Sequence, residues 1–214
     1  MQSKVILVTT ALLIFIPAVV FFHNDFANMP TRHKLFYSLF QAITPRTAGF
    51  NTADFNAMTG PGRSITILLM LIGGSPGSTA GGMKTTTIAV LFANSLASFR
   101  HHEDVQLFQR RIEPQVVRDA ATILIMYVSL FLGGGVVISM VEHLPMSLCL
   151  FETASAVGTV GLTLGITPML GDTSRLILIF LMFSGRVGGL TLIYAALSSK
   201  KKLSRAPVDK ITVG

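Results

Sequence analysis

The sequence is poor in the residues on which soluble and secreted proteins depend. Only 13% of its 214 residues are charged, it contains one cysteine, Cys149, and half of it is hydrophobic. A single cysteine permits no internal disulfide and says nothing about the redox compartment. The mean hydropathy of +0.63, with charges clustered between long apolar runs, is typical of a protein that crosses a membrane several times.

Groupings of catalytic or metal-binding residues are scarce as well. The apolar runs hold neither paired acids nor Ser, His and Lys at matched depth, which an intramembrane enzyme needs. The cluster His101-His102-Glu103-Asp104 lies in a charged loop, and consecutive residues rarely converge on one metal, so we interpret it as solvated surface. A nucleotide P-loop is disfavoured because Met83 separates Gly82 from Lys84 and no strand pattern precedes them. We therefore expect no enzyme and no covalent cofactor.

Four apolar runs are long enough to be spanning helices. A helix rises about 1.5 Å per residue, so about 20 residues cross a hydrocarbon core of roughly 30 Å. The first run follows Lys4, as in a signal peptide, but it is long for that role and lacks a small-residue cleavage site. The runs are 5–22, 65–96 with an interruption at 73–87, 116–140 and 176–197.

The basic residues gather on one side of this four-span arrangement. The positive-inside rule then predicts that both termini are cytoplasmic. The net charge of +7 is thus explained by topology, and no soluble basic domain suggests nucleic acid as a partner. The richer side carries Lys4, Arg100, Arg110, Arg111, Arg118 and the tail Lys200, Lys201, Lys202, Arg205 and Lys210; the other keeps Arg32, Lys34, Arg63 and Arg175, with Arg46 deeper.

An internal repeat is hidden in the apolar sequence. Residues 39–51 align with residues 150–163 across a single-residue gap, and the register continues into the runs that follow. Each copy contains a segment, 34–44 or 145–157, that is too short to cross a membrane and suits a re-entrant half-helix. Loops at membrane depth are tolerated where they are buried or line a watery cavity. We predict an all-α membrane protein of two helix/pore-loop/helix repeats.

The loops behind these half-helices are candidates for a selectivity filter. Backbone carbonyls can replace the water around a cation such as K⁺, and aiming them at one axis requires glycine. One Thr-x-Gly tripeptide alone is also a common packing motif in membrane helices, but two copies at matched positions favour a filter. The predicted filter residues are Thr47, Ala48 and Gly49, with Gly158, Thr159, Val160 and Gly161 in the second copy.

Four motifs together resemble the Trk/Ktr/HKT superfamily of K⁺ transporters, and most closely its KtrB-type membrane subunit. They are TPRTAGFNT (44–52), GGSPGSTAGGMKTTT (73–87), FETASAVGTVGLTLG (151–165) and FSGRVGGLTL (183–192). The resemblance implies four repeats around one pathway, of which this chain holds the third (1–98) and fourth (116–199), joined by a cytoplasmic loop (99–115) and ending in a tail (200–214). We expect a fragment of a longer protein, since pairing two copies would duplicate a buried arginine.

The resemblance also implies that the interruption is a gate lying below the filter. Its glycines and Pro76 cannot sustain a helix, and its hydroxyls can satisfy the freed backbone groups. The resemblance also places Arg186 in the pathway beside this loop, where it would contact the loop; pairing with a carboxylate is disfavoured because its own span contains no acid. Lys84 either belongs to the gate or snorkels toward lipid headgroups. The gate residues are Gly73, Gly74, Ser75, Gly77, Ser78, Thr79, Gly81, Gly82, Lys84 and Arg186.

The function implied is K⁺ uptake across a prokaryotic plasma membrane, with Na⁺ as a modulator. The alternatives are a non-selective or Na⁺-preferring conductor, and a fragment that is inactive without the two missing N-terminal repeats. The implied partners are a second membrane subunit and a cytoplasmic ring of nucleotide-binding KtrA/TrkA-type subunits. The closing DKITVG resembles the family's C-terminus, so we expect that end to be complete. Glu152 either tunes the field at the filter or packs a helix, and Gly133-Gly134-Gly135 and Gly188-Gly189 allow close helix packing.

Overall fold

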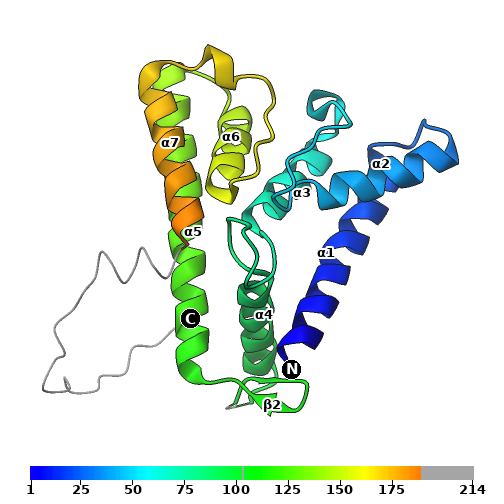
Figure 1. Cartoon of the computed structure of the whole chain (residues 1–214), viewed down its shortest axis with the longest axis vertical. Coiled ribbons are helices and arrows are strands. Elements are labelled where there is room, and N and C mark those ends of the chain that lie inside the picture. The colour runs from blue at the N-terminus through cyan, green and yellow to red at the C-terminus, as the bar shows by residue number, and fades with distance from the viewer. Residues whose placement is uncertain (103, 189–214) are drawn as a thin grey trace, which may run out of the picture.

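Nearly all of the described chain is helical (Figure 1). The computed structural model describes residues 1–102 and 104–188. The expected helix beyond residue 188, the tail 200–214 and the DKITVG end therefore lie outside the described residues. The helices are α1 (Gln2–Asn24), α2 (Thr31–Ile43), α3 (Gly60–Leu71), α4 (Thr85–Phe99), α5 (Pro114–Glu142), α6 (Met146–Gly158) and α7 (Asp172–Val187), with 3₁₀ turns at Phe55–Ala57 and Thr167–Met169.

Two of the helices, α1 and α5, are long and apolar enough to cross a bilayer by length and composition. The other two predicted spans have a different form. The run 65–96 is divided into α3 and α4, because residues 72–84 between them are not helical. In the run 176–197, α7 ends at Val187, and Gly188 has a φ of +87°, which a helix cannot continue.

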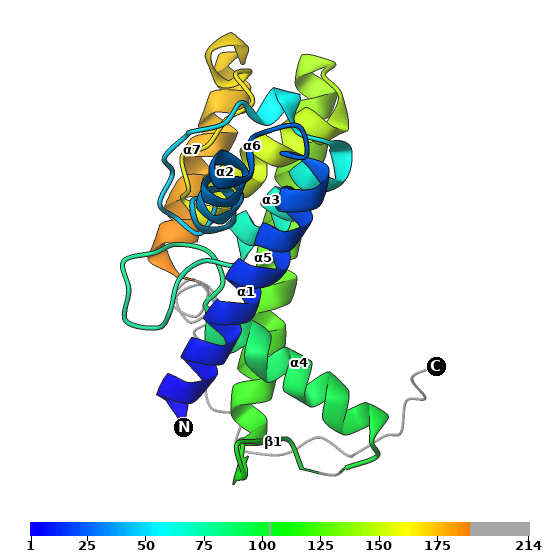
Figure 2. The same cartoon turned by 90° about the vertical axis from the view of Figure 1, so that its right-hand side faces the viewer.

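The two halves of the chain have the same order of elements. Each begins with a long helix, α1 or α5, followed by a helix of 13 residues, α2 or α6, then a loop and a further helix. Pro30 and Pro145 occupy the N-caps of the two short helices, where a fixed φ and a missing N–H do no harm. The halves differ in burial, since α6 is enclosed whereas α2 projects outward beside the end of α1 (Figures 1 and 2).

Helix α6 is the centre of the packing, with α3, α5 and α7 around it. Small residues permit this closeness: a Cβ at Gly185 of α7 would lie 1.9 Å from the carbonyl oxygen of Val157. The Tyr127 hydroxyl of α5 donates to the Gly185 carbonyl at 3.3 Å. Gly134 and Gly135 pack closely as expected. The expectation is wrong for Gly133 and Gly188, where a Cβ would meet nothing within 4 Å among the described residues, and Gly189 lies outside them.

We predict that Gly185→Ala lowers the stability of the protein. The added methyl group would overlap the Val157 carbonyl, and overpacking of this kind costs about 1–3 kcal/mol. Gly133→Ala is the matched control, because its methyl group would meet no described residue within 4 Å and alanine favours a helix by about 0.5–1 kcal/mol. Thermal unfolding in detergent should show a lower midpoint for Gly185→Ala only; equal midpoints would contradict the packing argument.

The connecting segment 99–115 adds a small hairpin to the otherwise helical fold, which the sequence analysis did not predict. It contains a hairpin of β1 (Gln106–Leu107) and β2 (Arg110–Arg111), whose turn residues Phe108 and Gln109 have φ of 49° and 62°. Positive φ at both turn positions matches the twist of paired strands, but the turn lacks the Asn-Gly signal that would predict it. Asp104 forms an ion pair with Arg111 at 2.8 Å, and the described residues contain no group of three metal ligands.

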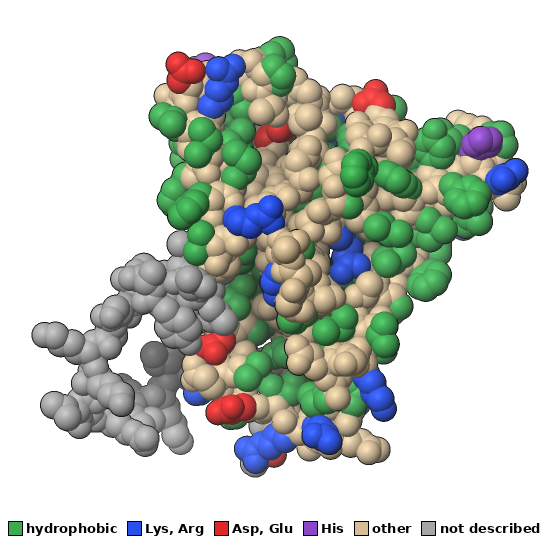
Figure 3. Space-filling view, viewed as in Figure 1, with side chains coloured by type: hydrophobic (Ala, Val, Ile, Leu, Met, Phe, Trp, Pro, Cys, Tyr) green, Lys and Arg blue, Asp and Glu red, His purple; other side chains and the backbone are tan. Residues whose placement is uncertain are grey.

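Apolar side chains cover much of the surface (Figure 3). Large hydrophobic residues on α1, α5 and α7, such as Leu7, Ile125 and Leu176, are more than 60% exposed. Lysine and arginine side chains gather at the lower end of the view, and others lie near its middle. Surfaces of this kind are costly in water and natural in lipid, which agrees with a membrane protein.

Candidate functional site

The loops that follow α2 and α6 repeat the same backbone conformation. Thr47 and Gly49 have φ of 68° and 76°, and their counterparts Thr159 and Gly161 have φ of 53° and 90°. A non-glycine residue with positive φ is uncommon, so its recurrence at the two threonines shows that the loops follow the same course. The sequence repeat therefore extends to the local backbone geometry.

Equivalent hydrogen bonds hold each loop to its short helix. The Ala48 N–H donates to the Thr44 carbonyl at 3.2 Å, and the Val160 N–H donates to the Ser155 carbonyl at 2.9 Å. Side chains at the same two positions add to this: the Thr44 hydroxyl donates to the Phe50 carbonyl, and the Ser155 hydroxyl accepts from the Gly161 N–H. In both loops, backbone N–H groups are therefore bonded to the end of the preceding short helix.

The carbonyl oxygens of the two tripeptides remain available. Within the described residues, no hydrogen bond is accepted by the carbonyls of 47–49 or 159–161. Ala48 and Gly161 are exposed, and Thr47, Gly49 and Thr159 are half-buried, so these tripeptides are accessible to another partner. A partly dehydrated cation is such a partner.

The two loops meet each other directly. A Cβ at Gly49 would lie 2.2 Å from the carbonyl oxygen of Val160, so the loops can approach this closely only because residue 49 is glycine. Gly161 is different, because it is exposed and a Cβ there would meet nothing within 4 Å. The two loops are thus in contact at Gly49, whereas Gly161 is exposed.

The interruption 72–84 forms a loop beside the C-terminal end of α6. We call residues 72–74 and 82–84 its root and residues 77–80 its tip. The root is closed by hydrogen bonds from the Gly73 N–H to the Met83 carbonyl at 2.8 Å and from the Met83 N–H to the Leu71 carbonyl at 3.0 Å. Figure 2 shows the tip projecting below α2 toward the end of α7.

The loop also touches the predicted filter. A Cβ at Gly81 would lie 2.2 Å from the Thr159 hydroxyl oxygen and 2.9 Å from the Gly158 carbonyl oxygen. Gly158, which the sequence assigned to the filter, is the last residue of α6 and packs against the Met70 carbonyl of α3. The loop 72–84 is therefore in contact with the residues that begin the loop after α6.

Three cationic side chains from different elements bond to carbonyls of this loop. Arg186 of α7 donates to the Thr79 carbonyl at the tip. Lys84 donates to the Ala80 carbonyl at 2.6 Å and lies 3.4 Å from that of Ser78, a direction that differs from snorkelling toward lipid. Arg46 donates from Nη2 to the Gly73 carbonyl at 3.4 Å, and none of the three is in an ion pair with a described residue.

Arg46 had entered the sequence analysis only through topology. The available signal was an arginine between an apolar half-helix and a filter-like tripeptide, where an isolated charge needs a functional or structural partner. The sequence could not identify that partner, because Gly73 is separated from it by helix α3. Only the fold brings the two together.

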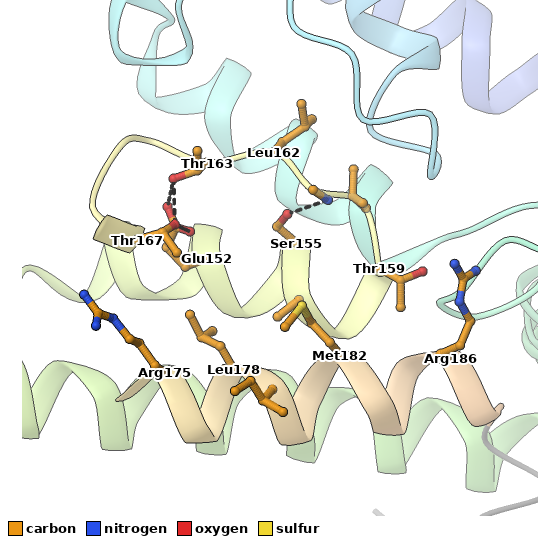
Figure 4. Close-up of a pocket in the computed structure, with 14 residues that line it drawn as sticks. Glu152, Ser155, Thr159, Leu162, Thr163, Thr167, Arg175, Leu178, Met182 and Arg186 are labelled. Carbon is orange, nitrogen blue, oxygen red and sulfur yellow. Dashed lines mark hydrogen bonds between the residues drawn. The ribbon is translucent and has the colours of Figure 1, made fainter. Parts of the chain in front are cut away.

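A groove of about 690 Å³ lies between α6, its loop and α7 (Figure 4). Arg175 lies near one end of it and Arg186 near the other, with Met182 between them. Exposed apolar side chains of α7 form one wall. The Gly161 side of the loop after α6 faces this groove, which is open along its length.

Glu152 fixes the segment that follows this loop. Its carboxylate accepts hydrogen bonds from the Thr163 and Thr167 hydroxyls, both at 2.6 Å, and from the Leu164 N–H at 3.0 Å. The side chain is buried, and its counterpart in the first half is the equally buried Gln41. Its hydrogen bonds are therefore with the loop segment, a role that the sequence analysis did not predict; an effect on the field at the filter stays a prediction.

Comparisons with known proteins agree on one family. A family model named TrkH and described as a cation transport protein matches residues 1–204. The Ktr system potassium uptake protein B of Bacillus subtilis is 34% identical over the whole chain, and the potassium/sodium uptake protein NtpJ of Enterococcus hirae is also 34% identical. The chain spans about half the length of these relatives, 49% and 50%.

A solved structure is similar as well. The crystal structure of the potassium transporter TrkH from Vibrio parahaemolyticus matches 91% of this chain and 43% of its own chain, with a TM-score of 0.73. The sequence identity of 21% means that this likeness concerns the fold. The helical arrangement described above therefore recurs in a known transporter.

Proposed function

Because the chain belongs to the TrkH family of cation transport proteins, we propose that it forms half of a potassium uptake pathway. The observation that carries the proposal is the set of unpaired carbonyls in the two matched loops, 47–49 and 159–161, which meet at Gly49 and Val160. The names of its relatives, which describe potassium or potassium/sodium uptake, support the choice of ion.

In this proposal the two loops supply two sides of a selectivity filter. Carbonyl oxygens replace part of the water around K⁺ without adding a fixed charge. The C-terminal ends of α2 and α6 lead directly into the loops, and the partial negative charge of a helix C-terminus favours a cation there. The other two sides would come from further repeats, which the half-length match to the relatives leaves room for.

The loop 72–84 would be the gate of this pathway. It touches Thr159 on one side, and Arg186, Lys84 and Arg46 hold its carbonyls. Fixed positive charges next to the pathway also repel cations while the loop stays in place. Moving the loop and its charges apart would open the path, and K⁺ would then flow down the membrane potential, worth about 2.3 kcal/mol per charge per 100 mV.

The remaining assignments follow the family resemblance. The basic end that carries Arg100, Arg110, Arg111 and Arg118 would be cytoplasmic, with both termini on that side of a prokaryotic plasma membrane. It would contact a ring of nucleotide-binding regulatory subunits, and two membrane subunits would form a dimer. The open groove beside α7 would be closed by the further repeats of the same subunit.

A second candidate is a pathway that conducts Na⁺ as well as K⁺. NtpJ of Enterococcus hirae, described as a potassium/sodium uptake protein, is 34% identical to this chain, as is the potassium uptake protein B of Bacillus subtilis. A filter with one glycine in each loop constrains few carbonyls, so discrimination between the two ions depends on their exact spacing. Competition of Na⁺ with rubidium uptake distinguishes this candidate from the first.

Rubidium uptake and K⁺-dependent growth test the proposal. The chain alone and the chain fused to the first two repeats of a related protein are compared in a bacterial strain without its own K⁺ uptake. We expect rescue by the fusion alone, because two loops cannot enclose an ion. Rescue by the chain alone would mean that two copies complete the pathway, and a correctly inserted fusion without uptake would contradict the proposed function.

A further inference from the structure

Arg46 occupies the position where the loop after α2 and the loop 72–84 come together. It lies directly before Thr47, the first residue of the tripeptide 47–49, and its Nη2 donates to the Gly73 carbonyl. Its Nε is buried and donates to no acceptor among the described residues. A half-buried guanidinium of this kind is held in place by the few hydrogen bonds it makes.

The Gly73 carbonyl belongs to the closed root of the loop. Around it, residues 72 and 83 form a parallel bridge, and the Thr85 N–H donates to the Gly74 carbonyl at 3.1 Å. Arg186 and Lys84, in contrast, bond to carbonyls of residues 78–80 at the tip. Arg46 therefore bonds to the root of the loop, whereas Arg186 and Lys84 bond to its tip.

Exposure follows the same division. Gly73, Gly81, Gly82 and Met83 are buried, whereas residues 77–79 are exposed. A segment with an anchored, buried root and an exposed tip is expected to move at the tip, because opening the root would break its backbone bonds and bury unpaired groups.

We propose that Arg46 is a positioning residue that fixes the root of the 72–84 loop to the loop after α2. The tip then moves about this root, while Arg46 transmits any shift of the root to Thr47 in the neighbouring loop. The anchoring stands on the contacts alone; its consequence for gating rests on the proposed function.

Hydrogen exchange in nanodiscs tests the anchoring without any transport, using the fused assembly. In Arg46→Gln, amide exchange should rise roughly tenfold or more in peptides that carry the root amides of Gly73 and Met83, since a charge-assisted bond is lost. In Arg186→Gln the increase should fall on the tip peptide instead. Arg32→Gln is the matched control, because it removes an exposed arginine of α2 that makes no hydrogen bond to a described residue.

The conservative variant keeps the test decisive. Arg46→Lys retains the charge but loses the planar fork, so its root exchange should lie between those of the wild type and Arg46→Gln. If Arg46→Gln raises exchange in α5 as well, the comparison is made on Arg46→Lys alone. Root exchange equal to the wild type in the folded variant would overturn the anchoring. Altered root exchange with no transport by the wild-type fusion would count against the proposed function and leave the anchoring standing.

Discussion

Replacing Gly161 with serine should leave the protein folded and raise the permeation of Na⁺ relative to K⁺. Among the described residues, a Cβ at Gly161 would meet nothing within 4 Å, so the substitution causes no clash within this chain. It does strain the backbone, because φ at this position is +90° and such strain costs about 1–3 kcal/mol. The strain should shift the neighbouring carbonyls. A change of about 1.4 kcal/mol in the free-energy difference between K⁺ and Na⁺ at these carbonyls would raise relative Na⁺ permeation roughly tenfold.

The measurement is the inhibition of rubidium uptake by Na⁺ in the fused assembly, normalised to folded protein. Gly165→Ser is the matched control, since Gly165 has a φ of +91° and equally open surroundings but lies outside the tripeptide. The same loss of selectivity in both variants would show that strain anywhere in the segment suffices, and the filter assignment of Gly161 would be wrong.

Gly49→Ser separates packing from selectivity. Its Cβ would lie 2.2 Å from the Val160 carbonyl oxygen, so the two loops must move apart to accept it. We therefore expect less folded protein as well as weaker selectivity, in contrast to Gly161→Ser. The two glycines of the repeat look interchangeable in the sequence and differ in the structure, which makes the pair more informative than either alone.

Features determined by local backbone chemistry were predictable from the sequence. Five glycines and Pro76 within ten residues strongly disfavour a helix, so the interruption after α3 could be placed to within a few residues. The two 13-residue helices also lie near their predicted positions, because a turn-forming proline precedes each and a glycine-containing loop follows. These signals act over one or two turns of chain.

Features that depend on contacts between distant segments were not predictable. The Arg46 contact with Gly73 and the Glu152 contacts with Thr163 and Thr167 join residues that the fold alone brings together. The hairpin at 106–111 depends on Phe108 and Gln109 adopting positive φ, which neither residue favours by itself. In each case the contact or backbone conformation depends on tertiary structure and not on local sequence propensity.

Replacing Arg186 with glutamine should increase transport through the fused assembly. Arg186 is the contact that holds the exposed tip of the loop from α7, through the Thr79 carbonyl. A hydrogen bond from a charged group contributes about 1.5–3 kcal/mol, which corresponds to roughly a 10- to 100-fold change in an equilibrium between held and released loop. Removing the guanidinium also removes a positive charge that repels cations.

A comparison of three variants separates the bond from the charge. Arg186→Lys keeps the charge but holds the carbonyl less firmly, so its uptake rate should lie between those of the wild type and Arg186→Gln. Deleting residues 77–82 removes the tip together with Gly81 and Gly82, and it should give the highest rate. Arg175→Gln is the control on the same helix, since Arg175 bonds to the Pro168 carbonyl and Asp172 and is not hydrogen-bonded to the loop.

The initial rate of rubidium uptake per folded transporter decides the outcome. If the loop is a gate, the rates should rise in the order wild type, Arg186→Lys, Arg186→Gln and the deletion, with Arg175→Gln equal to the wild type. A folded Arg186→Gln protein that transports no faster than the wild type would mean that the contact with Thr79 does not limit flux. The loop would then be a structural support for the filter, a role that its contact between Gly81 and Thr159 would also fit.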